Sequence, residues 1–474
     1  MRRLAIIGAL SACLLGGASV EVMADEQTEK ALEERVKRLE KLVEELTKHG
    51  VKEATEECKE KNEKGECKEK QEKTAAKPLD LSSPGGGKLI YAKPFVSSPK
   101  ATVGGYMDLQ YRLFNSSNST GVGQSGNGQG SSTFDQQRFV PFFYSDITDR
   151  IKVASEVEIE HGIRSKSNDG SSIEVSVEFA TIDYLITEPI NLRAGIILLP
   201  VGKFNLLHDS PLNELADRPL VATAVIPSTL SETGAGFYGT VYPSRLSKVD
   251  YELYVTQGFN GYRKDRSPVI TADAGLRDAR QRVSTVDDGL DNNNGKAVVG
   301  RVAFSPILGV EVGGSGYFGS YDPASKRPLS IWAADWTFQR GPFRLIGEAA
   351  WVYARDNNRT LDGGFALDAN GRPLPRRMDG FYIEGDYHFM PDTLRRWAPS
   401  HFTEASTFTA VVRWDEANTN SEFADTARQR LTLGLNFRPI SDTVFRADYQ
   451  FNFEDGKNNR IRNDGLVLSV ATYF

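Results

Sequence analysis

The sequence predicts an all-β protein: a transmembrane antiparallel β-barrel of about 16 strands, preceded by a short N-terminal coiled-coil helix. Three observations predict this fold. The chain begins with an export signal, residues 100–474 alternate between apolar and polar positions, and the connections between the alternating segments are short and long in turn. A closed barrel meets the demands of lipid because all its backbone polar groups are bonded between neighbouring strands.

Residues 1–24 have the pattern of a cleaved signal peptide. Arg2 and Arg3 precede a short apolar run, and Ala24 ends a small-residue cleavage site. The run is shorter than the ~20 apolar residues that a membrane-spanning helix needs. We therefore expect export with cleavage before Asp25. A retained anchor and a lipid attached to Cys13 are the alternatives.

Residues 25–50 are expected to form a periplasmic coiled coil. Apolar residues recur there with spacings of 4, 3, 4 and 3 between charged positions, at Leu32, Val36, Leu39, Val43 and Leu46. This is the heptad pattern of a coiled coil. A solvated amphipathic helix is the alternative.

Residues 51–99 read as a charged spacer that ends in a flexible, glycine-rich linker. Cys58 and Cys67 lie in this spacer and are candidates for a disulfide in the oxidising periplasm. Their spacing matches no haem or zinc motif. A small structural loop or a link between chains is the role that we expect of them.

Residues 100–474 are expected to form the barrel. Residues 150–161 alternate most clearly, and the pattern recurs in residues 172–186, 249–258, 343–354, 428–438 and 443–453. Short turns are expected near residues 148–149, 188–189, 244–247, 306, 341 and 439–440. Long loops are expected at residues 115–133, 162–170, 200–235, 260–295, 321–328, 356–378, 419–427 and 456–463. Residues 391–404 are an exception, since a turn is expected there but the segment is long.

The chain ends on Phe474 after an alternating segment. A terminal aromatic residue at the end of such a strand is similar to the assembly signal of outer-membrane barrels. The other aromatic residues add modest support, because rings are favoured where a barrel wall meets the two membrane surfaces.

The composition makes several functions improbable. The net charge of −6 and the lack of a basic stripe argue against nucleic acid as a partner. Five scattered histidines and the absence of nucleophile, phosphate-binding or metal-binding motifs predict no catalytic residues, no metal site and no cofactor. We therefore do not expect an enzyme.

If the apolar face of each strand contacts lipid, the opposite face lines the lumen. The pore-lining acidic residues are then Glu156, Glu158, Glu174, Glu178, Asp250 and Glu252. The pore-lining basic residues are Arg112, Arg413, Arg428, Arg430, Arg438 and Arg446. Acids on the earlier strands and arginines on the later ones predict an acidic wall that faces a basic wall. Solvated wall residues in mutual salt bridges are the alternative.

Residues 193–239 resemble the phosphate-selective porin O and P family. The resemblance is carried by residues 193–195, 199–202, Asn205, His208, 217–219, 226–227 and 232–236. It implies a homotrimer of sixteen-stranded barrels whose third external loop folds into the pore. That constriction loop contains Lys203, His208, Asp209, Glu214, Asp217 and Arg218. Its acidic residues differ from the lysines that the resemblance implies at the throat of a phosphate pore.

These observations predict a bacterial outer-membrane porin with its N-terminal region in the periplasm. Its partners would be outer-membrane lipid and small hydrophilic solutes, with anions such as phosphate among the candidates. A structural barrel that tethers the envelope through its coiled coil is one alternative, and a sheath around a partner protein is another. A barrel enzyme such as a lipase is a third, but it needs a Ser/His pair that we do not find.

Overall fold

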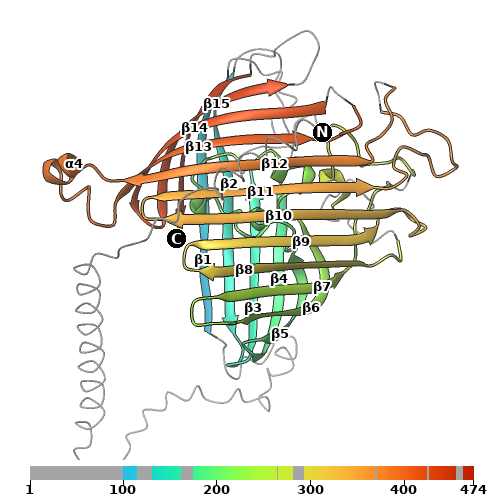
Figure 1. Cartoon of the computed structure of the whole chain (residues 1–474), viewed down its shortest axis with the longest axis horizontal. Helices are drawn as coiled ribbons and strands as arrows, with labels where there is room; N and C mark the ends of the chain where they lie inside the picture. Colours follow the sequence, from blue (N-terminus) through green and yellow to red (C-terminus); the bar gives the residue numbers. More distant parts are fainter. Residues whose placement is uncertain are drawn as a thin grey trace, which may run out of the picture. The chain divides into compact units, whose positions relative to one another are not determined.

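Sixteen antiparallel strands close into one barrel in a computed structural model of the chain (Figure 1). The structure describes residues 100–114, 131–161, 174–263, 265–280, 293–368, 371–423, 426–454 and 463–474. The expected signal peptide, coiled coil and spacer, with Cys58 and Cys67, lie outside these residues. In the part of the chain that is described, no helix has the length and apolarity needed to cross a membrane.

Each strand is hydrogen-bonded to the strands before and after it in sequence. Consecutive pairing with this connectivity is an up-and-down barrel, as the sequence predicts. The strands are β1 (Lys100–Phe114), β2 (Ser131–Asp146), β3 (Ile151–Glu160), β4 (Glu174–Thr187), β5 (Ile190–Leu198), β6 (Ser231–Val241), β7 (Lys248–Thr256), β8 (Ala297–Ile307), β9 (Val310–Ser320), β10 (Pro328–Arg340), β11 (Phe343–Ala354), β12 (Arg377–Phe389), β13 (Thr407–Asn418), β14 (Ala427–Ile440), β15 (Thr443–Glu454) and β16 (Gly465–Tyr473).

The barrel closes where the last strand pairs with the first. The register of β1 and β16 runs from Tyr106 opposite Tyr473 to Phe114 opposite Gly465. Beyond it, the amide of Phe474 donates to the carbonyl oxygen of Gly105 at 2.9 Å, and the amide of Gly105 donates back at 3.2 Å. The Phe474 ring stacks on Phe139 of β2, with 5.7 Å between ring centroids. We call the pairing of β1 with β16 the seam, and Phe474 extends it by two hydrogen bonds.

The connections alternate in length as expected, with one correction. The expected loop 200–235 ends earlier, because β6 already begins at Ser231 and places Glu232 in the wall. The exception expected at residues 391–404 is the long connection between β12 and β13, which contains a short helix, α4 (Asp392–Trp397). Figure 1 shows α4 at the end of the barrel where the short turns lie.

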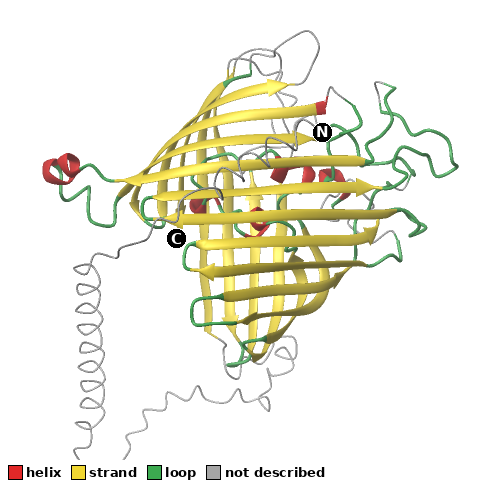
Figure 2. Ribbon diagram, in the orientation of Figure 1, coloured by secondary structure: helices red, strands yellow, loops and turns green. Residues whose placement is uncertain are grey.

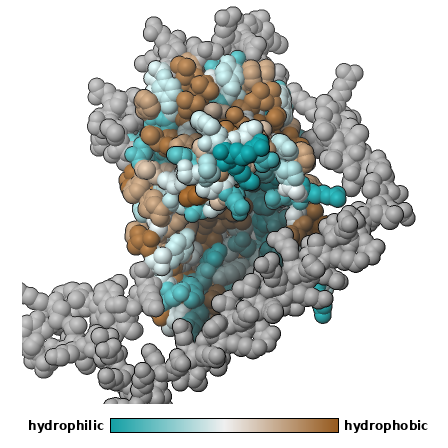
Figure 3. All heavy atoms as spheres, turned by 90° about the vertical axis from the view of Figure 1, so that its left-hand side faces the viewer, coloured by the Kyte–Doolittle hydropathy of each residue, from teal (hydrophilic) through white to brown (hydrophobic). Residues whose placement is uncertain are grey.

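The outward face of the wall is apolar. Val103, Val302, Val412 and Leu435 are each at least half exposed, and all lie on strands whose alternate residues are buried. Seen from the end of the short turns, hydrophilic side chains gather toward the centre and hydrophobic ones are frequent along the edge (Figure 3). This is the arrangement of a barrel surrounded by lipid.

Aromatic rings form a band at the turn end of β11 to β14. Contacts join Phe343 to Tyr387, Phe389 to Phe408 and Phe408 to Phe437, with centroid distances of 4.9, 5.8 and 4.8 Å. Rings of this kind are typical where a barrel wall meets the membrane surface.

We predict that removal of Phe474 lowers the folded, membrane-inserted fraction of the protein several-fold in a Gram-negative host. The deletion removes two backbone hydrogen bonds and a ring stack at the seam. The measurement is the heat-dependent mobility of the barrel on a gel. Phe445→Ala, at an outward position of β15 away from the seam, is the control. Equal folded fractions for the deletion and the control would contradict the role of the seam.

Candidate functional site

Residues 199–230, which connect β5 to β6, lie inside the barrel and are called the inward loop. They contain α3 (Lys203–Leu206), η2 (Ser210–Leu212) and a single π-helical turn, η3 (Val221–Val225). Figure 2 shows these short helical segments among the strands of the barrel. The loop forms hydrogen bonds with β4, β9, β11 and β13 to β16, which occupy different sides of the wall. It therefore crosses the lumen.

Asn205 holds the two ends of the inward loop together. Its Nδ2 donates to the carbonyl oxygens of Leu199 and Leu230 at 2.8 and 2.9 Å, and its Oδ1 accepts from the amide of Leu230 at 2.8 Å. Asn205 is 1% exposed. One buried amide thus fixes the point at which the chain leaves the wall and returns to it.

Gly202 starts α3 with a φ of 73°, a conformation that glycine adopts without strain. A Cβ at this position would lie 2.4 Å from a carboxylate oxygen of Glu348. The close approach lets the amide of Gly202 donate to Ser315 Oγ, and that of Phe204 to Glu348 Oε2, both at 2.9 Å. Glycine is therefore required at position 202 for the loop to bind strands β9 and β11.

Arginines of the later strands hold the middle of the loop. Arg446 Nη1 donates to the carbonyl oxygens of Ser210, Asn213 and Leu215 at 3.1, 3.2 and 3.0 Å. Arg438 Nη1 donates to Pro211 at 2.8 Å. These two guanidinium groups satisfy loop carbonyl groups that would otherwise be buried without donors.

The Glu214 side chain binds two strands of the wall. Its carboxylate accepts from Asn436 Nδ2 at 2.9 Å and lies 3.4 Å from Arg438 and 3.6 Å from Arg344. This acidic residue therefore attaches the loop to amide and basic side chains of β14 and β11.

Asp217 is the most strongly bonded acid of the loop. Its carboxylate binds Arg112, accepts from Gln450 Nε2 at 2.7 Å and lies 3.7 Å from Arg430. Its carbonyl oxygen accepts from Arg413 Nη2 at 2.9 Å. Burial raises the pKa of Asp217, but Arg112 and Arg430 outweigh this and hold it below the usual range. Asp217 therefore stays ionised between basic groups from β1, β13 and β14.

The second half of the loop forms an apolar core within the barrel. Leu220, Val221, Val225 and Ile226 are at most 9% exposed and belong to one cluster with inward residues of β7 to β13. Room for them comes from small wall residues: a Cβ on Gly380 would lie 3.2 Å from Val221. The inward loop is therefore a packed structural element.

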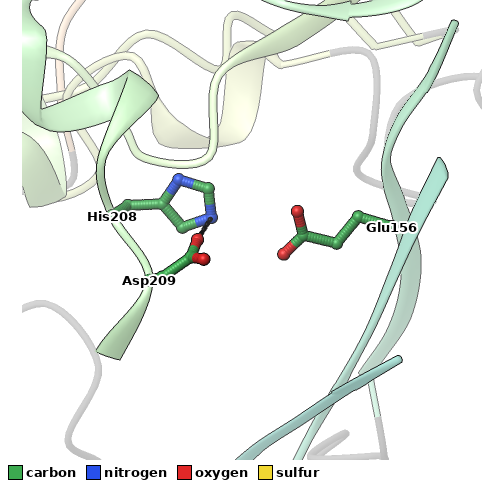
Figure 4. Close-up of side chains that lie close together, drawn as sticks. All are labelled: Glu156, His208 and Asp209. Atoms are coloured by element: carbon green, nitrogen blue, oxygen red, sulfur yellow. Dashed lines mark ion pairs between the residues drawn. The ribbon is translucent and has the colours of Figure 1, made fainter. Parts of the chain in front are cut away.

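Inward acids of the earlier strands meet the first half of the loop. Glu156, Glu158 and Glu178 are at most 3% exposed. Glu178 Oε2 lies 3.0 Å from His208 Nε2, and Glu158 lies 3.0 Å from Arg138 and 3.6 Å from Arg218. Figure 4 shows the side chains of Glu156, His208 and Asp209 close together.

The remaining predicted residues lie elsewhere on the wall or, for Lys203, at the start of α3. Asp250 pairs with Lys248 and accepts from Thr240, and Glu252 accepts from Tyr254 at 2.7 Å. Glu174 opens β4 opposite Glu160 of β3. Arg428 lies opposite Ala417 near the loop end of β14, and the Lys203 ammonium lies 2.9 Å from Glu311.

An acidic wall that faces a basic wall is not what the structure shows. The later strands carry buried inward acids beside the arginines, namely Asp335, Glu348, Glu384, Asp386, Asp415 and Asp448. Arg413, for example, donates to Asp415 at 2.9 Å. Opposite charges are paired locally because buried charges need partners.

The sequence interpretation missed Arg138, Arg193, Arg301 and these later acids. Strand alternation could have revealed some of them, such as Arg193, which shares a face of β5 with Asn191 and Gly195. Their pairing partners come from neighbouring strands, and the register that joins them requires the folded sheet.

No protein-family model matches the chain. An uncharacterized protein of Aquifex aeolicus (strain VF5) is 28% identical over 401 residues, covering 82% of this chain and 83% of its own length. Solved structures with a similar fold include the outer membrane channel DcaP of Acinetobacter baumannii and an anion-selective porin from Comamonas acidovorans. Each is 10% identical over 79% of this chain, with a TM-score of 0.48, covering 97% and 99% of those chains.

We predict that Asn205→Ala loosens the inward loop while the barrel stays folded. The change leaves buried backbone groups unsatisfied, at a cost of about 1–3 kcal/mol. Hydrogen exchange measured by mass spectrometry should become about tenfold faster or more in residues 199–230. Asn191→Ala is the matched control, because its side chain accepts from the amide of Ile186, away from the loop. Unchanged exchange in the Asn205 variant would show that the loop is held elsewhere.

Proposed function

We propose that the protein is an outer-membrane porin that lets small hydrophilic solutes diffuse passively through its lumen. The observation that carries this proposal is the contrast between the two faces of one closed wall. The outward face is apolar, and the inward face carries charged side chains on almost every strand. Such a wall separates lipid from a polar interior.

The inward loop supports the proposal because it would set the width of the passage. Charged groups beside it keep contact with solvent: the side chains of Arg112, Asp217 and Arg430 are 12%, 14% and 14% exposed. Solutes would pass these groups at the narrowest part of the lumen. Charges at a constriction act strongly on passing ions because the surrounding wall has a low dielectric constant.

Anions such as phosphate are the narrower proposal. Arg428 and Arg430 lie two residues apart on the inward face of β14 and would attract anions. Asp217 offsets part of this charge, and Arg446 is occupied by loop carbonyl groups. We therefore propose a modest anion preference that depends on Arg428 and Arg430 more than on Arg446.

A homotrimer in the outer membrane, with the N-terminal region in the periplasm, is the assembly that we propose. The resemblance of residues 193–239 to phosphate-selective porins supports it. A barrel that only tethers the envelope through its coiled coil, or encloses a partner protein, would pass no current by itself.

We predict stepwise currents when the purified full chain is added to a planar lipid bilayer. In a salt gradient, the double variant Arg428→Gln with Arg430→Gln should move the reversal potential towards cation preference. The shift should shrink at 1 M salt, where the screening length falls to about 3 Å.

Two exposed arginines away from the lumen provide the control, Arg245→Gln with Arg340→Gln. It removes the same charge and should leave the reversal potential unchanged. Absence of current from the folded wild-type protein would refute the channel. If the wild type, the double variant and the control all conduct with equal reversal potentials, the anion proposal is refuted and the channel proposal stands.

A further inference from the structure

Side chains from three distant parts of the sequence meet where the inward loop contacts β3 and β4 (Figure 4). Glu156 comes from β3, and His208 and Asp209 come from the loop. One potential ligand atom of each lies within 4.8 Å of the other two. Glu178 of β4 adds a carboxylate oxygen 3.0 Å from His208 Nε2. One imidazole nitrogen is thus surrounded by three carboxylates.

Glu156 carries the strongest sign of a missing partner. It is 3% exposed, its Oε1 accepts no hydrogen bond from a donor among the described residues, and its carboxyl group lies against that of Glu178. Figure 4 shows the carboxylate directed toward His208 and Asp209. A buried carboxylate oxygen without a partner is costly, and a cation among these groups would remove that cost.

We propose that Glu156, Glu178, His208 and Asp209 form a binding site for a divalent transition-metal ion such as Zn²⁺. One imidazole with carboxylates is a donor set that suits zinc and its neighbours in the first transition row. Calcium and magnesium prefer oxygen ligands alone. Three ionised carboxylates carry one more unit of charge than a divalent ion, so they can neutralise the ion where it is buried.

The groups behind the ligands restrain their orientation. His208 Nδ1 lies 2.9 Å from the carbonyl oxygen of Asn205, so a proton on Nδ1 leaves the lone pair of Nε2 facing the carboxylates. The Tyr473 hydroxyl donates to Asp209 Oδ2, and the Thr229 hydroxyl donates to Glu178 Oε1, both at 2.8 Å. Such supporting bonds fix the tautomer of a ligating histidine and the direction of its carboxylates.

The ligand atoms must move closer together to bind an ion. Two ligand atoms of a tetrahedral zinc ion at about 2.0–2.1 Å lie about 3.4 Å from each other, so atoms that lie up to 4.8 Å apart must approach by up to about 1.4 Å. Rotation of the Glu156 and Asp209 side chains would have to supply this closure. The Asp209 side chain is 18% exposed, whereas His208 and Glu178 are almost fully buried. An ion would therefore enter from the side of Asp209.

Metal binding would displace a proton. His208 Nε2 lies 3.0 Å from Glu178 Oε2, a contact in which one of the two atoms must carry a proton to form a hydrogen bond. A metal ion would take the place of that proton, because a ligating imidazole must present a free lone pair.

The sequence gives no hint of this site. Its ligands have no metal-binding spacing, since 52 positions separate Glu156 from His208 and only the return of the loop into the barrel joins them. The absence of a metal site was the expectation from motifs, and the proposal departs from it.

The test is a titration of the purified full chain with Zn²⁺ alone, after treatment with a chelator. Isothermal titration calorimetry should show one ion per chain, with release of a proton seen as a dependence of the heat on the buffer. Glu156→Gln should weaken binding by about 10–100-fold. Glu160→Gln, on the same face of β3 but paired with Arg138, is the matched control and should bind as the wild type does.

Equal affinities in the two variants, or no binding by the wild type, would overturn the proposal. If Glu156→Gln fails to fold, crystals of the wild type soaked in Zn²⁺ decide the question. Anomalous scattering should place the ion between Glu156 and His208. An ion found only elsewhere would overturn the site, and none of these outcomes depends on whether the barrel conducts.

Discussion

The pairing of β16 with β1 is the constraint on which the rest of the structure depends. An open sheet in lipid would leave a row of amide and carbonyl groups at each edge without partners, at several kcal/mol for each group. Closure removes both edges, and the strand alternation then assigns every side chain either to lipid or to the interior. Phe474 extends this seam by pairing with Gly105. The charged interior can exist only because the sheet around it is complete.

Within this wall, the inward loop is a second structural layer. Its apolar half packs against small residues of β12 and β14, and its polar half is held by arginines and carboxylates. The charges of the lumen therefore stabilise the loop as well as face the solvent. Arg446 illustrates the point, since it is 3% exposed and donates to three carbonyl groups of the loop. A substitution of Arg446 would therefore change the shape of the lumen more than its charge.

The sequence predicted the strand number, the alternating connections and the inward direction of acids such as Glu156, because these follow from a two-residue period. It did not predict that Glu156 would meet His208, or that Asp217 would lie among Arg112, Arg413 and Arg430. Those contacts depend on strand register and on the path of the 32-residue inward loop, which begins at Leu199 and ends at Leu230. Neither is encoded in a local pattern. The acids of the later strands follow the same two-residue period, but their pairing with arginines depends on the register of neighbouring strands.

The central claim is that one face of the wall lines a water-filled passage and the other contacts lipid. Arg430 and Leu433 of β14 test it, because they lie three residues apart on opposite faces. Each is replaced by cysteine in a background with Cys13, Cys58 and Cys67 changed to serine. A charged, water-soluble thiol reagent is then added during single-channel recording. We predict a stepwise change of current with Arg430→Cys and none with Leu433→Cys. An unaltered current with Arg430→Cys, after modification is verified by mass, would contradict the account.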